Sequence, residues 1–312
     1  MRLRPRCSKF GPVKNVVLSI AGAALLLAAG YMALHERGPS TPAELAAYLP
    51  DKEGTLLYAD VDAMRKAGIL TMLAGPRSTE DADYKDFVQQ TGFDYRHDLD
   101  AVAVTLRSGQ IFFAVRGRFD WDKLTAYAKK RGGSCKANYC VADGSQPSRR
   151  ISFHKLRSNL MAMAVSPDDM AAYQIVRNAG KVNPFSPDAP VWAIVPSAAL
   201  KEANSLPPGA EAFALAIEKA DRAIFSITAD GDHLKVVVSV TCKNVEAASN
   251  LLVQLEGTTN RLRTMLAREN RTANPGDLSG VLVAGSFRRD DRQVYGEWPL
   301  QRTFVESIAG GQ

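Results

Sequence analysis

The densest group of side chains that could do chemistry lies in one seven-residue segment, Asp94-Tyr95-Arg96-His97-Asp98-Leu99-Asp100. Asp94, His97, Asp98 and Asp100 supply three carboxylates and an imidazole, which can hold a divalent cation or act as general acid and base. Arg96 opposes this hypothesis, because its positive charge offsets the field that a cation requires. Aspartates before a strand also accept hydrogen bonds from backbone amides in turns. The segment therefore has two interpretations, a metal-assisted hydrolytic site and a structural loop.

The four cysteines are Cys7, Cys135, Cys140 and Cys242. A two-residue turn at Ala137-Asn138 would place Cys135 opposite Cys140 with Cα atoms about 4.5 Å apart, which is within disulfide range. Such a bond requires an oxidising compartment. The alternatives are two unrelated thiols in a loop, or a zinc site that lacks a second pair of ligands. Cys242 ends an apolar run and is expected to be a buried, small hydrophobic residue.

Signatures of the common enzyme classes are absent from the sequence. It contains no Gly-x-Ser-x-Gly, no phosphate-binding loop ending in Gly-Lys-Ser or Gly-Lys-Thr, and no His-Glu-x-x-His. The histidines stand at positions 35, 97, 154 and 233, so no two have the spacing of metal ligands on one helix. We therefore assign no catalytic, cofactor-binding or metal-binding residue, and we expect a protein without enzymatic activity.

The helices and strands around the segment 94–100 must position it. The same order of helices and strands occurs twice along the chain. Residues 55–180 predict strand, helix, hairpin, helix, hairpin and helix, and residues 191–312 predict the same series. The segment 181–190, which has three prolines, separates the two copies as a linker. The apolar residues Leu234, Val236, Val238 and Val240 recur at every second position, which is typical of an antiparallel strand with one covered face. The prediction is an α+β protein, with two diverged copies that contain antiparallel sheets.

Particular residues set the expected ends of these elements. We expect Asp62 to cap a helix that continues to Leu73, and Asp120 to cap a helix that Gly132 ends. The longest predicted helix covers residues 245–269.

The N-terminal 34 residues predict a membrane anchor. Residues 16–34 contain no charged side chain, and as a helix they reach across a hydrocarbon core of about 30 Å. Residues 1–15 form a basic tail that would stay in the cytoplasm, which places the C-terminal body on the extracytoplasmic or periplasmic side of the inner membrane. A cleaved signal peptide, cut near Ala28-Ala29-Gly30, is the alternative. Residues 35–54 are expected to form a spacer and a short helix.

The formal net charge of +6 belongs to the basic tail. Five of the 39 lysines and arginines, and none of the 33 acidic residues, precede Leu34, which leaves 34 basic against 33 acidic residues in the body. Nucleic acid binding needs a basic face on the folded domain, so we expect no nucleic-acid partner. Hydrophobic residues make up 46% of the sequence, which is typical of a globular protein.

Three segments carry a family resemblance. They are Leu49-Pro50-Asp51-Lys52-Glu53-Gly54-Thr55-Leu56-Leu57-Tyr58-Ala59-Asp60-Val61-Asp62-Ala63-Met64-Arg65, Thr91-Gly92-Phe93-Asp94 and Gly117-Arg118-Phe119-Asp120. Together they resemble a group of bacterial envelope proteins that look like single-pass anchored proteins with repeated α+β ectodomains and have no assigned activity. The resemblance implies a bacterial envelope setting and transfers no site residue.

These observations favour a membrane-anchored extracytoplasmic protein that is a binding or envelope-structural module. Its expected partners are the membrane and an envelope protein. The alternative function is a metal-assisted hydrolase that uses Asp94, His97, Asp98 and Asp100. A third possibility, a lipid carrier, would require an apolar groove between helices and sheet.

Overall fold

The computed structural model describes residues 41–50, 54–74, 82–107, 109–144, 149–178, 186–200, 210–231 and 233–310. The predicted tail and anchor at 1–34, and half of the predicted linker, lie outside these ranges. Within them, no helix is both long enough and apolar enough to span a membrane.

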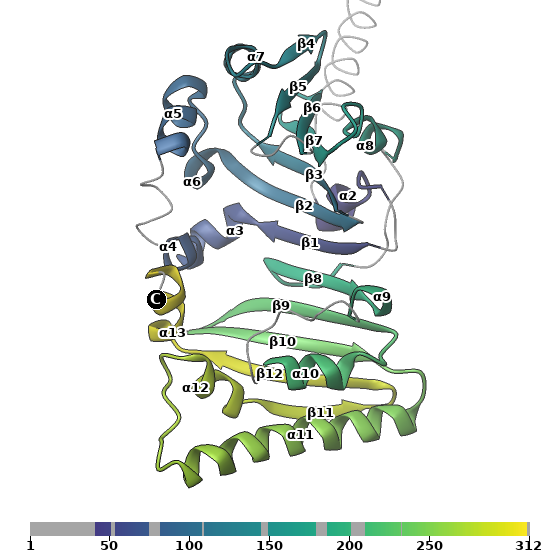
Figure 1. Cartoon of the computed structure of the whole chain (residues 1–312), viewed down its shortest axis with the longest axis vertical. Helices are drawn as coiled ribbons and strands as arrows, with labels where there is room; N and C mark the ends of the chain where they lie inside the picture. Colours follow the sequence, from purple (N-terminus) through teal and green to yellow (C-terminus); the bar gives the residue numbers. More distant parts are fainter. Residues whose placement is uncertain are drawn as a thin grey trace, which may run out of the picture. The chain divides into compact units, whose positions relative to one another are not determined.

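One antiparallel sheet organises the described chain and confirms the α+β prediction (Figure 1). Its 12 strands lie in the order β11-β12-β10-β9-β8-β1-β2-β3-β7-β6-β5-β4. The strands are β1 (Thr55–Asp60), β2 (Leu99–Arg107), β3 (Gln110–Gly117), β4 (Ser134–Lys136), β5 (Tyr139–Asp143), β6 (Arg150–Arg157), β7 (Leu160–Ser166), β8 (Val191–Pro196), β9 (Arg222–Asp230), β10 (His233–Thr241), β11 (Ser286–Asp290) and β12 (Gln293–Leu300).

The two halves of the chain share this sheet, because β1 pairs with β8. Leu57 lies opposite Ala193, and Tyr58 lies opposite Trp192. The sequence predicted antiparallel sheets in two copies, but it gave no sign that the first strand of each half would pair with the other. Outward from this junction, the strand order is β1-β2-β3-β7-β6 in one half and β8-β9-β10-β12-β11 in the other, and β5 and β4 extend the first half.

Capping side chains set the starts of several helices. Thr41 and Glu44 form a capping box at α2, Asp120 caps α7, and Asn244 caps α11. The helices are α2 (Pro42–Ala46), α3 (Val61–Lys66), α4 (Ile69–Ala74), α5 (Ala82–Thr91), α6 (Tyr95–Asp98), α7 (Trp121–Lys130), α8 (Tyr173–Asn178), α9 (Ser197–Leu200), α10 (Ala210–Ile217), α11 (Val245–Arg268), α12 (Leu278–Val283) and α13 (Arg302–Gly310).

One predicted cap was wrong. Asp60, rather than Asp62, caps α3 by accepting a hydrogen bond from the Ala63 amide at 2.8 Å. Asp62 instead forms ion pairs with Arg65 and Lys66. The single helix expected from 62 to 73 is divided into α3 and α4 at Gly68, whose φ of 72° no helix accepts.

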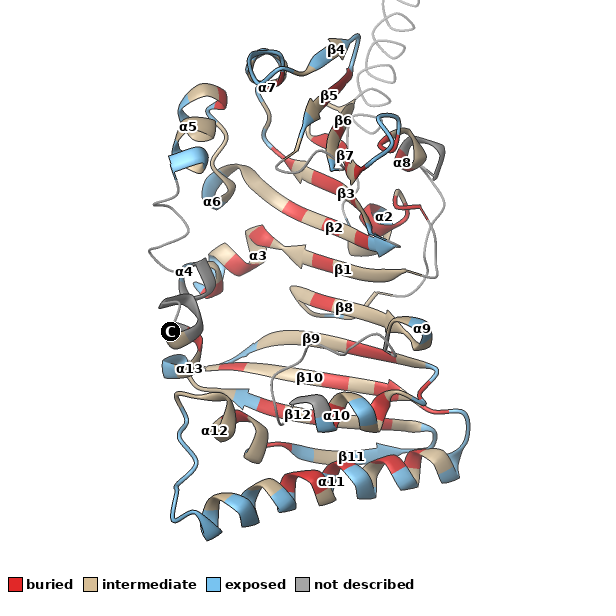
Figure 2. Ribbon diagram, viewed as in Figure 1, coloured by how far each residue is buried: buried red, intermediate tan, exposed pale blue. Residues whose placement is uncertain are grey.

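One face of the sheet is buried over β1, β2, β3 and β7. Small side chains there allow α2, α8 and the turn before α8 to pack closely, and Figure 2 shows the buried positions as red bands along β2 and β3. This core is built from Leu45, Ala46, Leu49, Tyr58, Ala101, Ala103, Phe112, Ala114, Tyr139, Val141, Leu160, Ala162, Ala164, Ala171, Ala172, Ile175 and Trp192. Trp192 comes from the second half and stacks on Tyr58 with ring centroids 5.3 Å apart.

The opposite face of the sheet is covered differently along its length. Over β9, β10 and β12 it forms a core with α10, α11 and α12, and α11 lies along β11 (Figure 1). At one end of β1 and β8, a smaller cluster of Met64, Ile69, Leu234 and Val305 joins α3 and α4 to α13. Beside these two clusters, over β2, β1, β8 and β9, the side chains on this face are apolar but only half-buried.

Candidate functional site

The polar segment 94–100 folds as a loop and a one-turn helix. The Asp94 carboxylate accepts hydrogen bonds from the Arg96 amide at 2.9 Å, the Arg96 guanidinium at 2.7 Å and the Tyr84 hydroxyl at 2.8 Å. Arg96, and after it Tyr84, hold the pKa of Asp94 well below its usual range. Burial, together with the hydrogen bond to Asp94, raises the pKa of Tyr84. Asp94 therefore acts as a helix cap.

Asp98 closes the same loop. Its carboxylate accepts a hydrogen bond from the Asp94 amide at 2.9 Å and pairs with Arg118 at 3.3 Å. Arg118 also donates to the carbonyl oxygen of His97. Asp100 lies near the start of β2, where the pairing register with β3 shifts between Leu99 and Ala101. Among the described residues, no three His, Cys, Asp or Glu side chains lie where they could share a metal ion. The described geometry thus lends the metal-assisted alternative no support.

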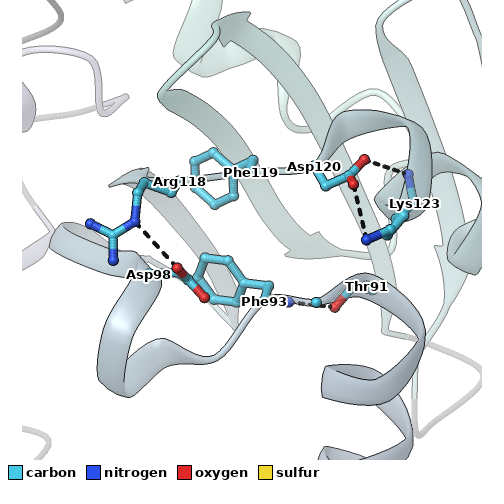
Figure 3. A pocket seen from close by; sticks show the side chains of 8 residues that line it. Thr91, Phe93, Asp98, Arg118, Phe119, Asp120 and Lys123 are labelled. Carbon is cyan, nitrogen blue, oxygen red and sulfur yellow. Dashed lines mark hydrogen bonds and ion pairs between the residues drawn. The ribbon is translucent and has the colours of Figure 1, made fainter.

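A cavity of about 410 Å³ lies beside this loop, where α5 ends and α7 begins (Figure 3). Phe93 and Phe119 stack on each other in its wall, with ring centroids 5.3 Å apart and planes 13° from parallel. It is lined by Thr91, Gly92, Phe93, Asp98, Arg118, Phe119, Asp120 and Lys123. Its four charged residues form two ion pairs, Asp98 with Arg118 and Asp120 with Lys123, each 3.3 Å long. The cavity consequently has an aromatic wall and no net charge.

A second cavity, here called the helical cavity, lies between the sheet and α10, α11 and α12. Its volume is about 310 Å³. It is lined by Phe213, Ala214, Ile217, Phe225, Val236, Val238, Val240, Leu255, Val281, Leu282, Val294, Gly296 and Trp298. Trp298 is in edge-to-face contact with Phe213 at 5.9 Å and with Phe287 at 5.4 Å. Only the Trp298 indole nitrogen adds a polar side-chain atom to this lining.

A third cavity, here called the central hollow, lies at the junction of the two halves on β2, β1, β8 and β9. Its volume is about 380 Å³. It is lined by Leu57, Tyr58, Ala59, Val102, Val104, Val191, Trp192, Ala193, Phe225 and Ile227. Antiparallel pairing puts Val104, Leu57, Ala193 and Phe225 in one row across the four strands. Phe225 lines both apolar cavities, so they adjoin on the same face of the sheet.

The two cysteines predicted to pair lie opposite each other. β4 and β5 are joined by Ala137 and Asn138, with Ala137 at a φ of 52°. Cys135 and Cys140 are the second pair out, with Cα atoms 4.1 Å apart, and their sulfurs are bonded. Cys242 is free and buried, and burial raises the pKa of its thiol.

Sequence reasoning pointed to the polar loop and missed the apolar cavities. The strands that form them were predicted, but two of the covering helices, α10 and α12, were not. A signal for α10 exists, because Ala210–Ile217 is an apolar run after Pro207, Pro208 and Gly209. The cavities depend on strand order, which no local pattern reveals.

Comparison with known proteins adds a likeness of structure. No protein-family model and no curated protein sequence matches the chain. Among solved structures, crystal forms I and III of TP0453 of Treponema pallidum are similar, with 11% and 10% sequence identity and TM-scores of 0.48 and 0.49. The alignments cover 87% and 88% of this chain and 98% and 100% of those chains. No function follows from a likeness at this level.

Proposed function

We propose that this chain is a single-pass, membrane-anchored extracytoplasmic protein whose body is a binding module rather than an enzyme. The observation that carries the proposal is the apolar face of β2, β1, β8 and β9. Val104, Leu57, Ala193 and Phe225 are half-buried there, whereas Trp192 on the opposite face of the same strands is 1% exposed. The hollow over these residues has a volume of about 380 Å³ and an apolar lining, which is the size and character of a ligand-binding site.

Four further observations support the proposed function and location. Residues 16–34 have the length and composition of a membrane span, with cations on the N-terminal side only. The remainder of the chain is near neutral, as expected of a body that does not bind nucleic acid. The bonded pair of Cys135 and Cys140 suits an oxidising compartment. The resemblance to envelope proteins agrees with a bacterial envelope setting.

We also propose that residues 55–180 and 191–312 are diverged copies of one unit. The support is topological, since β1-β2-β3-β7-β6 and β8-β9-β10-β12-β11 are the same order of equivalent strands. α7 follows the first hairpin of one half, as α11 follows the first hairpin of the other. The central hollow then lies where the two copies meet, across their first strands.

A photo-crosslinking amino acid tests whether the apolar face binds a partner. It is placed at Val104, in the central hollow, in the full chain in intact cells. The matched control carries it at Asp122, which is exposed on α7. We expect a discrete adduct from Val104 that is absent from Asp122, and its mass separates a protein partner from a lipid. Equal adducts at both positions, or none at Val104, would contradict the proposal.

A further inference from the structure

We infer that the helical cavity binds one acyl chain, which extends past Phe225 into the central hollow. The inference rests on the proposed function and names the class of ligand for the same apolar face. It follows from the chemistry of the lining, from the volume and length of the two cavities, and from the proposed place of the body beside a membrane.

The lining gives a polar ligand a single side-chain partner, the buried indole donor of Trp298, which has no hydrogen-bond partner among the described residues. The one polar side-chain atom among the lining residues is Trp298 Nε1, and it faces Gly285, where an added Cβ would lie only 2.6 Å from it. A peptide in this cavity would leave its backbone amides and carbonyls without partners, which is costly in an apolar site. A hydrocarbon chain requires no hydrogen bonds and fits the lining.

The volume of the helical cavity is that of a binding site rather than of a packing defect. Protein interiors are close-packed, with few voids larger than a water molecule, whereas small-molecule sites occupy about 300–1,000 Å³. The helical cavity, at about 310 Å³, reaches this range, and its walls are apolar apart from the Trp298 indole nitrogen.

The combined length of the two adjoining cavities fits an extended chain. From β2 through β1, β8, β9 and β10 to β12 the apolar face crosses five spacings between strands, or about 24 Å at about 4.8 Å each. One acyl chain fills about half of a hydrocarbon core about 30 Å thick. The face is therefore long enough for one such chain to lie across the strands.

The probe is a fatty acid that carries a photoreactive diazirine on its chain, added to membranes that contain the full-length protein. After irradiation, the crosslinked peptides are identified by mass spectrometry. We expect crosslinks in peptides from α10, β9 and β10, in addition to any in residues 16–34. Crosslinks confined to residues 16–34 would overturn the inference, because they would show contact with the bilayer only.

Two tryptophan substitutions form a matched pair. Ala214→Trp fills the helical cavity, whereas Leu215→Trp adds a ring of the same size at the next residue, which is 60% exposed. We expect crosslinking within the body to fall about tenfold in Ala214→Trp, equivalent to about 1.4 kcal/mol of binding, and to stay unchanged in Leu215→Trp. Equal crosslinking in both folded variants would overturn the inference. If Ala214→Trp does not fold, Ala214→Met provides the smaller filling, and the wild-type crosslink map decides by itself.

The outcomes separate this inference from the proposed function. Adducts from Val104 to a protein, with no acyl crosslinks in the body, would support the binding module and refute the acyl ligand. Acyl crosslinks in a body that lies in the cytoplasm would support the acyl ligand and refute the proposed location.

Discussion

Asp94 begins α6 with its side chain only 14% exposed and with Arg96 and Tyr84 as partners. A carboxylate whose pKa is lowered in the folded state stabilises that state above the pKa of the unfolded chain. The stabilisation is lost as the pH falls toward the lowered value. For Asp94 it is complete above about pH 4, the ordinary pKa of an aspartate.

We therefore predict that Asp94→Asn lowers the free energy of unfolding at pH 7 by about 1 kcal/mol, since the ion pair is lost while asparagine can still cap the helix. Below about pH 4 the difference from wild type should shrink, because protonation removes the same charge from the wild-type chain. Urea unfolding at pH 7, 4 and 3 measures both effects. A difference that stays constant with pH would show that Asp94 does not stabilise the fold as an ionised group.

Two glycine-to-alanine substitutions test the packing in the second half, one at a crowded position in the core and one at an open position on α11. A Cβ at Gly296 would lie 2.6 Å from the Trp298 ring and 3.2 Å from Phe287, whereas at Gly257, inside α11, it would meet nothing within 4 Å. Gly296→Ala should destabilise the protein by about 1–3 kcal/mol through overpacking. Gly257→Ala should stabilise it by up to about 1 kcal/mol, because alanine favours a helix. Thermal unfolding of both variants gives the signs, and a neutral Gly296→Ala would contradict the packing around Trp298.

Among the elements, the β4–β5 hairpin gives a sharp test of the redox environment. If Cys135 and Cys140 are bonded in the cell, the full chain denatured without reductant has two reactive thiols, Cys7 and Cys242, and after reduction it has four. To make this count, free thiols are blocked during extraction so that they cannot oxidise or exchange. The thiols blocked before reduction and those freed by reduction are then counted separately. Four thiols before reduction would show that the hairpin is reduced in the cell.

Local chemistry made several elements predictable from the sequence. Asp120 has the position of an N-cap before an amphipathic segment, and the structure places it there. Alternation from Leu234 to Thr241 identified β10. The start of α3 was misplaced by two residues, because Asp60 and Asp62 are equally good caps and only the end of β1 decides between them.

Long-range pairing made the candidate site unpredictable. The central hollow combines strands from residues 57 to 227, and it exists because β1 pairs with β8. Nothing local to Leu57 or Ala193 encodes that pairing. The polar loop, by contrast, was visible because its residues are consecutive, but sequence could not show that Arg96 and Arg118 pair with its carboxylates.

At the scale of the whole molecule, the β1–β8 junction ties the two halves together. Trp192 of β8 packs in the core of the first half and stacks on Tyr58. Trp192→Ala should cost about 3–5 kcal/mol and speed amide hydrogen exchange in β2 and β3 as well as in β9 and β10. Trp121→Ala, at the start of α7, should affect the first half only. Faster exchange confined to the second half in Trp192→Ala would contradict a shared core.

The proposed location unites the anchor, the disulfide and the acyl ligand, and topology reporters test it most directly. Two reporters are fused in turn after Gln312 of the full chain, one active only outside the cytoplasm and one active only inside it. The account predicts activity from the outer reporter and none from the inner one. Activity from the inner reporter alone would contradict it and place the folded body in the cytoplasm.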